Sequence, residues 1–294
     1  MTGRLYTPSA VRELCRRYGI RPAKGLGQNF LADKNIVDRI IEGAGIERDD
    51  CVIEVGAGMG VLTAAAAEKA RRVVAVELDK RLMPLLAEVL ADRDNVRVIN
   101  GDILKLDLRD LLRPDETARG RTRILGNLPY YITSPVILRF LEEGPPAAGM
   151  TFMLQREVAE RINAQAGGKA YGALTVAVRY HCETSLVAQV SREVFIPRPQ
   201  VDSSVLRFDI RREKAVTPQS EAMFFALVRA GFGKRRKTLL NALTGLAGCD
   251  KTEIERALAA AGLDAGRRAE TLELCEFAAA ADAVCALVRS RGGV

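Results

Sequence analysis

The tetrapeptide Asn127-Leu128-Pro129-Tyr130 combines residue types that suit chemistry on the exocyclic amine of an adenine. Such an amine is a poor nucleophile, because its lone pair is delocalised into the ring. The Asn127 amide oxygen and the Leu128 carbonyl are acceptors for its N–H groups and would localise that lone pair. Pro129 fixes the turn, and Tyr130 offers a ring for base stacking, worth about 1–3 kcal/mol. The tetrapeptide predicts methyl transfer to adenine; the alternative is an Asn-Pro turn with a packed tyrosine.

A glycine-rich turn from Glu54 to Gly60 is a second candidate for chemistry, with the order Glu-Val-Gly-Ala-Gly-Met-Gly. Gly56 and Gly58 permit close backbone approach to a ligand and backbone angles that other residues resist. A dinucleotide fingerprint would need a further glycine where the chain has Val61. The turn therefore predicts a nucleotide-like ligand without a pyrophosphate and disfavours an NAD enzyme.

Two acidic residues follow later apolar runs at matching positions. Glu77 has the position to accept hydrogen bonds from two ribose hydroxyls, and Asp102 has the position to accept one from an adenine amine. The alternative is that such acids solvate strand ends or cap helices, which is how we interpret Asp79. Because the carboxyl ends of parallel strands share one edge, Gly56, Glu77, Asp102 and Asn127 should converge there.

The elements that would position these residues are short apolar runs alternating with segments of helical spacing. This alternation predicts β-α-β units and a parallel sheet. Two later runs, 184–190 and 203–210, alternate as antiparallel strands do. The predicted parallel strands lie at 51–55, 73–76, 96–99, 123–125 and 151–154. The fold class is α/β, with a Rossmann-like sheet.

The last third of the chain reads differently, as helices separated by glycines. We place a boundary near Glu213, with one domain at 1–212 and a small all-helical domain at 213–294. The helical part contains a dense basic run, Lys234-Arg235-Arg236-Lys237. The chain has 44 Lys and Arg against 37 Asp and Glu, and such a balance suits a polyanionic partner. A solvated helix start is the alternative interpretation of the run.

Composition narrows the class of protein further. The six cysteines have no C-x-x-C spacing and His181 is the only histidine, so we expect no metal site. No apolar stretch approaches the length of a membrane span, and the N-terminus lacks a secretion signal. We expect a cytoplasmic, monomeric protein with reduced cysteines.

Six motifs together resemble the small-subunit ribosomal RNA adenine dimethyltransferases, over nearly the whole chain. Glycine turns occur in many methyltransferases, but the combination of the motifs at 25–31, 127–130 and 195–204 is highly specific. An alanine at 269, where the family often has proline, is a minor departure. The motifs are 25–31 (Gly-Leu-Gly-Gln-Asn-Phe-Leu), 54–60, 127–130, 152–158 (Phe-Met-Leu-Gln-Arg-Glu-Val), 170–172 (Ala-Tyr-Gly) and 195–204 (Phe-Ile-Pro-Arg-Pro-Gln-Val-Asp-Ser-Ser).

The resemblance implies a cofactor, S-adenosylmethionine, and a substrate, 16S rRNA within the immature small (30S) subunit. It implies N6,N6-dimethylation of two adjacent adenosines near the 3′ end, with a role in subunit maturation. It adds Asn29 and Leu31 to the cofactor-binding residues, and it makes Phe195 the partner of Tyr130 in sandwiching a flipped adenine. Phe195 is otherwise a packing residue. The basic run would contact rRNA phosphates.

Two rival interpretations stay open beside this one. Large-subunit rRNA methyltransferases that confer macrolide resistance share the catalytic motifs, but the basic helical domain and the Val201-Asp202-Ser203 ending argue against them. A ribosome-assembly or transcription factor that lost catalysis is the second. The intact Asn127 and Tyr130 argue for activity.

Overall fold

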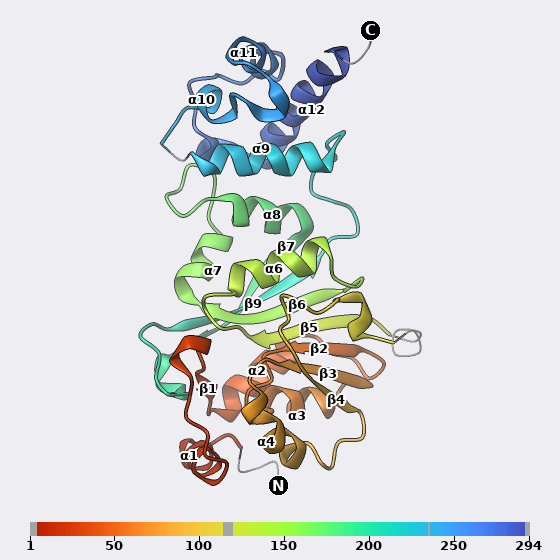
Figure 1. Cartoon of the computed structure of the whole chain (residues 1–294), viewed down its shortest axis with the longest axis vertical. Coiled ribbons are helices and arrows are strands. Elements are labelled where there is room, and N and C mark those ends of the chain that lie inside the picture. The colour runs from red at the N-terminus through yellow and green to blue at the C-terminus, as the bar shows by residue number, and fades with distance from the viewer. Residues whose placement is uncertain (1–4, 114–119, 235, 292–294) are drawn as a thin grey trace. The chain divides into compact units, whose positions relative to one another are not determined.

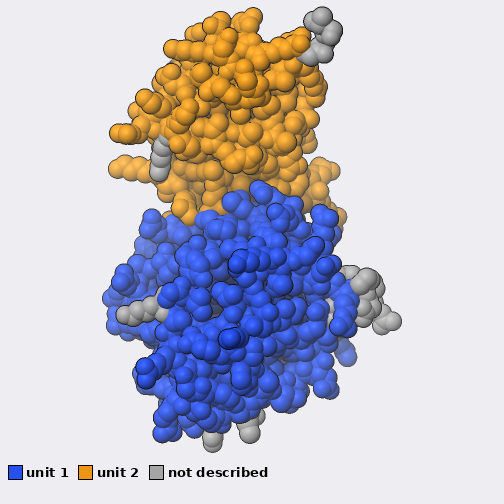
Figure 2. Space-filling model, in the orientation of Figure 1, with its two compact units in different colours: residues 1–159, 184–210 blue, residues 160–183, 211–294 orange. Residues whose placement is uncertain are grey.

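The computed structural model describes residues 5–113, 120–234 and 236–291 (Figure 1). The chain forms two compact units, distinguished by colour in Figure 2. The first comprises Met1–Ala159 and Thr184–Ile210, and the second comprises Glu160–Glu183 and Arg211–Val294. Each unit has its own hydrophobic core.

The first unit contains a sheet that has seven strands within the described residues (Figure 1). Its order is β4-β3-β2-β5-β6-β9-β7. The first five of these strands are parallel, and β9 pairs with β6 in antiparallel fashion. The strands are β2 (Cys51–Val55), β3 (Arg72–Glu77), β4 (Val96–Asn100), β5 (Thr122–Asn127), β6 (Gly149–Gln155), β7 (Cys182–Val190) and β9 (Ser203–Ile210). The predicted α/β class and its strands are confirmed.

Burial explains why these runs form strands. Every residue of β2 is buried, as expected for a central parallel strand covered on both faces. Four of the described helices contribute to the same core, and Asp33 caps α2 (Lys34–Gly43) by accepting from the Ile36 N–H. The other three are α1 (Pro8–Arg17), α3 (Val61–Ala67) and α4 (Met83–Val89). A further helix, α6 (Thr133–Glu142), buries Val136, Ile137 and Phe140, and the short 3₁₀ turns are η2 (Lys24–Leu26), η3 (Lys80–Leu82), η4 (Arg109–Leu111) and η5 (Arg192–Val194).

A two-stranded sheet, which the sequence did not predict, joins distant segments of the first unit. Strand β1 (Phe30–Leu31) pairs with β8 (Phe195–Ile196), so that Leu31 lies opposite Phe195. The Ala32 N–H extends this pairing by donating to the Val194 carbonyl at 2.8 Å. The pairing ties the N-terminal motif to the Phe195 segment.

The second unit is helical, as predicted for the last third of the chain. Its core gathers buried side chains such as Phe224, Leu258 and Phe277. The elements are α8 (Ala173–His181), α9 (Glu221–Gly233), α10 (Leu239–Leu243), η6 (Leu246–Gly248), α11 (Lys251–Ala260), η7 (Ala269–Thr271) and α12 (Leu274–Arg291). None of the described helices is long and apolar enough to cross a membrane.

The units differ from the predicted division at 212/213 in one respect. Residues 160–183, expected in the first domain, group with the helical unit. The reason is packing: Tyr171, Val176 and Tyr180 are buried in the second core, and the Tyr171 hydroxyl donates to the Leu272 carbonyl at 2.8 Å. The chain therefore enters the helical unit twice, and α7 (Arg156–Ile162) contains the first crossing.

Candidate active site

One cleft of the first unit lies at the carboxyl ends of the parallel strands, where ligands bind in open α/β sheets. The strand order reverses there, because β2 has β3 on one side and β5 on the other. The space at the cleft is about 1190 Å³, part of which is open solvent. Its walls include ten predicted site residues: Asn29, Leu31, Gly56, Gly58, Glu77, Asp102, Asn127, Leu128, Pro129 and Tyr130.

The glycine turn between β2 and α3 has the backbone conformation that its sequence requires. Gly56, Gly58 and Gly60 have φ angles of 77°, 57° and 77°, a left-handed region that strains other L-residues. The Gly56 N–H donates to the Val76 carbonyl at 2.8 Å, which closes the turn against β3. The backbone is thereby available to a ligand at close range.

Glu77, at the end of β3, is fixed by the same turn. One carboxylate oxygen accepts from the Gly58 N–H and the other from the Asp79 N–H, both at 2.8 Å. Burial raises the pKa of Glu77, and these two hydrogen bonds oppose that shift. Each oxygen keeps a further lone pair, so the side chain has the acceptor capacity that a pair of ribose hydroxyls needs.

Asp102 lines the cleft after β4 and also stabilises its own turn. Its Oδ1 accepts from the Leu104 N–H at 2.9 Å, and its Oδ2 lies 3.7 Å from the Lys105 ammonium. This is a turn contact and not the helix cap that we considered as an alternative, since none of the described helices begins there. It leaves acceptor capacity on the carboxylate, whose side chain is 29% exposed.

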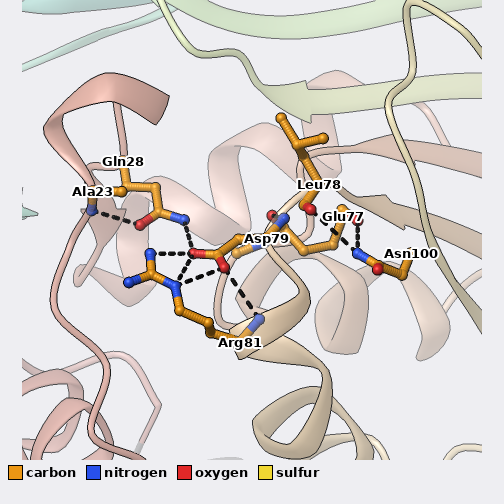
Figure 3. Close-up of polar contacts among 8 residues, drawn as sticks. Ala23, Gln28, Glu77, Leu78, Asp79, Arg81 and Asn100 are labelled. Atoms are coloured by element: carbon orange, nitrogen blue, oxygen red, sulfur yellow. Dashed lines mark hydrogen bonds and ion pairs between the residues drawn. The ribbon is translucent and has the colours of Figure 1, made fainter.

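Asp79 lies outside the predicted ligand set and caps η3, as expected, by accepting from the Arg81 N–H. It has a second role, which sequence reasoning missed (Figure 3). The Gln28 side-chain amide donates to Asp79 Oδ2 at 2.9 Å, and the Gln28 oxygen accepts from the Ala23 N–H at 2.8 Å. Hydrogen bonds from the Arg81 guanidinium, the largest cause, lower the pKa of Asp79 to about 2. The hydrogen bond from Gln28 to Asp79 anchors the N-terminal segment at the cleft.

Asn127 closes β5 and touches that same segment. Its Nδ2 donates to the Asn29 carbonyl at 3.1 Å, which leaves Oδ1 as the acceptor of this amide. Tyr130 is half-buried, and its hydroxyl lies 3.4 Å from Ser203 Oγ. The Thr133 hydroxyl donates to the Pro129 carbonyl at 3.3 Å and holds the turn. An amide acceptor and an aromatic ring thus line one wall.

The structure does not bring Phe195 into the cleft with Tyr130. Phe195 is 3% exposed, packs in the core of the first unit and pairs with Leu31 across the two-stranded sheet. In this conformation it takes the packing role, and its contact with a substrate base stays a prediction. Its burial follows from β1 and β8, pairing partners that are too short to predict.

The basic run lies between α9 and α10 of the second unit. Lys234, Arg236 and Lys237 are exposed, and none forms an ion pair with another residue of the described ranges. The Lys237 N–H donates to the Lys234 carbonyl at 2.8 Å and turns the chain there. Arg235 lies outside the described residues. The described part of the run presents uncompensated positive charge to solvent.

The charge of the cleft is of the opposite sign. Among the described residues that line it there are three carboxyl side chains, those of Glu54, Glu77 and Asp102, and no Lys, Arg or His. Phosphate groups normally pair with cationic side chains, so a pyrophosphate is a poor fit to this lining. A nucleoside that carries positive charge is a good fit.

Comparisons with known proteins agree with one another. The profile described as "Ribosomal RNA adenine dimethylase" matches residues 21–280. A "Ribosomal RNA small subunit methyltransferase A" of Clostridioides difficile is 45% identical over 288 residues, 98% of this chain and 99% of that protein. The protein of the same name from Pelotomaculum thermopropionicum is 49% identical over 284 residues, 94% of this chain and 96% of that one.

Two solved structures are similar to the fold as well. A dimethyladenosine transferase from Plasmodium falciparum matches with a TM-score of 0.72 at 25% identity, over 85% of this chain and 95% of that one. The 23S rRNA methyltransferase ErmE matches with a TM-score of 0.65 at 28% identity, over 87% of this chain and all of that one (100%). Both matches extend over most of this chain.

Proposed function

The chain belongs to the ribosomal RNA adenine dimethylase family, and from this premise we propose that it dimethylates the N6 amines of two adjacent adenosines near the 3′ end of 16S rRNA. It is an S-adenosylmethionine-dependent methyltransferase of small-subunit ribosomal RNA. The observation that carries the proposal is the cleft, in which the Asn127 amide and three carboxyl groups meet without a cation from the described residues.

The residues of the cleft fit S-adenosylmethionine, whose sulfonium makes its methyl group electrophilic. The two Glu77 oxygens suit the ribose hydroxyls, and Asp102 suits the adenine amine. The glycine turn, with Asn29 and Leu31, lines the same wall for the rest of the molecule. The fit rests on charge as well, because this ligand carries positive groups and lacks phosphate.

Asn127 performs the central step on the substrate side. Because its Nδ2 is held by the Asn29 carbonyl, its Oδ1 accepts an N–H of the target amine. The Leu128 backbone carbonyl accepts the other, and the two acceptors draw the nitrogen lone pair out of the ring. Catalysis here needs orientation more than a strong base. The absence of Lys, Arg and His from the described cleft lining agrees with that requirement.

Substrate recognition divides between the two units. Tyr130 stacks on the adenine after the base leaves its helix. Phe195 completes the sandwich only if its segment rearranges, since the side chain is buried here. The second unit, through Lys234, Arg235, Arg236 and Lys237, contacts rRNA phosphates. We place the reaction in the cytoplasm, on the immature 30S subunit and by a monomer, with a role in subunit maturation.

The experiment is methyl transfer from labelled S-adenosylmethionine to small and large subunits isolated from cells that lack the gene. Label is expected in small-subunit rRNA and, after digestion, in N6,N6-dimethyladenosine. Asn127→Ala is the negative control, because it removes the acceptor that the mechanism requires. Transfer to large-subunit rRNA would refute the substrate, and tight binding to subunits without transfer would favour the assembly-factor alternative.

A further inference from the structure

Glu54 is a buried carboxyl group that the proposed chemistry leaves without a role. It lies in β2, is 1% exposed and belongs to the wall of the cleft. Its Oε2 accepts from the Thr63 hydroxyl of α3. Its Oε1 is buried without a hydrogen-bond partner in the described part of the chain. A buried acceptor without a donor is rare in folded proteins, and it suggests a missing ligand group.

The surroundings of Glu54 disfavour a negative charge in the ligand-free protein. Its neighbours across the sheet are Ala75 and Leu125, which are apolar. Burial is the largest cause that raises the pKa of Glu54 to about 8; the nearby Glu77 adds to it, and the Thr63 hydrogen bond opposes it. The side chain is therefore mainly protonated at neutral pH until a donor or a cation enters the cleft.

We propose that Glu54 accepts a hydrogen bond from the ammonium group of bound S-adenosylmethionine and releases its proton to solvent as that ligand binds. The inference rests on the proposed function and deepens it. One O–H bond of the carboxyl breaks, its proton goes to the buffer, and an N–H···O contact replaces it. Binding and proton release are then coupled at this one residue.

The Oε1 of Glu54, unpartnered among the described residues, indicates the ammonium group of the ligand and not its sulfonium. An ammonium has N–H donors, whereas a sulfonium has none, so only the ammonium satisfies Oε1. The sulfonium also loses its charge during transfer, whereas the ammonium keeps it. A carboxylate beside the sulfonium would stabilise the ground state more than the transition state and would slow the reaction.

The test is isothermal titration calorimetry of wild-type protein with S-adenosylmethionine and S-adenosylhomocysteine, in buffers of different ionisation enthalpy at pH 7. A carboxyl group with a pKa of about 8 is roughly nine-tenths protonated there, and a free α-amino group takes up about 0.1 proton on charging. We expect wild type to release about 0.8 proton per ligand, and Glu54→Gln to release none. Glu13→Gln, an exposed carboxyl replacement on α1, should behave as wild type.

A second measurement needs no variant and remains decisive if Glu54→Gln fails to fold. In wild type with S-adenosylhomocysteine, the net number of protons released per ligand should fall between pH 7 and pH 9, and the protein–ligand complex should take up protons at the upper end of this range. The reason is that Glu54 is then already ionised while the ligand amine must gain a proton. A constant proton count across this range would overturn the proposal.

The remaining outcomes separate the inference from the proposed function. Equal proton release by wild type and a folded Glu54→Gln would overturn the role of Glu54. Release with S-adenosylmethionine but not with S-adenosylhomocysteine, which lacks the sulfonium, would overturn the ammonium assignment. Failure of wild type to bind either ligand would refute the methyltransferase assignment itself, and the inference with it.

Discussion

Replacing Glu54 by glutamine is expected to stabilise the ligand-free chain more at pH 8 than at pH 5. The carboxyl has an ordinary pKa of 4.5 in the unfolded chain and a pKa of about 8 in the folded chain. Because the pKa is higher in the folded chain, the protonated Glu54 carboxyl makes its full contribution to the free energy of unfolding below pH 4.5. This contribution is lost as the pH rises through 8. A neutral amide at the same position has no such dependence.

The magnitude follows from that pKa difference. Each pKa unit corresponds to about 1.4 kcal/mol, so wild type should lose about 3.5 kcal/mol relative to Glu54→Gln between pH 5 and pH 8. Any cost of fitting the amide beside Thr63 applies equally at both pH values. The quantity to measure is therefore the difference in the free energy of unfolding between wild type and Glu54→Gln, and how that difference changes from pH 5 to pH 8.

The assay is urea unfolding at pH 5 and pH 8, followed by far-ultraviolet circular dichroism because the chain has no tryptophan. Glu13→Gln, on the exposed surface of α1, is the matched control and should show no difference between the two pH values. If Glu54→Gln changed the free energy of unfolding by the same amount at both, Glu54 would not be protonated in the folded chain.

Three further predictions concern binding and transfer. Asn127→Ala should lower single-turnover transfer about 10²–10³-fold with subunit binding nearly unchanged, because it removes the acceptor for the target amine. Gln28→Leu removes the 2.9 Å hydrogen bond to the Asp79 carboxylate, worth about 1.5–3 kcal/mol, and should raise the calorimetric Kd for S-adenosylmethionine by roughly 10- to 100-fold. Reversing charge at Arg236 and Lys237 should weaken rRNA binding and reduce its salt slope by about two.

Each of these three variants has an outcome that would contradict its prediction. An unchanged rate in Asn127→Ala would show that the amide is not the acceptor. An unchanged Kd in Gln28→Leu would show that the N-terminal segment stays at the cleft without its anchor. Lys69→Glu, an exposed reversal in the first unit, should leave the salt slope unaltered. If wild type, the Arg236 and Lys237 charge-reversal variant and Lys69→Glu all had the same salt slope, phosphate contacts by the basic run would be refuted.

Most of the sheet and the position of the cleft were predictable from the sequence. Buried parallel strands need short β-branched runs, and such runs gave β2 and β3 nearly to the residue. Convergence at one sheet edge then placed Gly56, Glu77 and Asn127 together, because strand ends in this topology share that edge.

The remainder depends on contacts that leave no local pattern. A strand as short as β1 has no periodicity, so the pairing of Leu31 with Phe195, and the burial that goes with it, was not predictable. The Gln28 contact joins residues 51 positions apart. Segment 160–183 has ordinary helical spacing, and only its packing against the second core assigns it to that unit.

The most direct measurement is mass spectrometry of ribosomal RNA from cells with and without this gene. Two adjacent N6,N6-dimethyladenosines near the 3′ end of small-subunit rRNA are expected in the parent strain and absent from the deletion strain. Wild-type protein should restore both marks, and Asn127→Ala should restore neither. Unchanged small-subunit marks in the deletion strain, or marks lost from large-subunit rRNA instead, would contradict the proposed function.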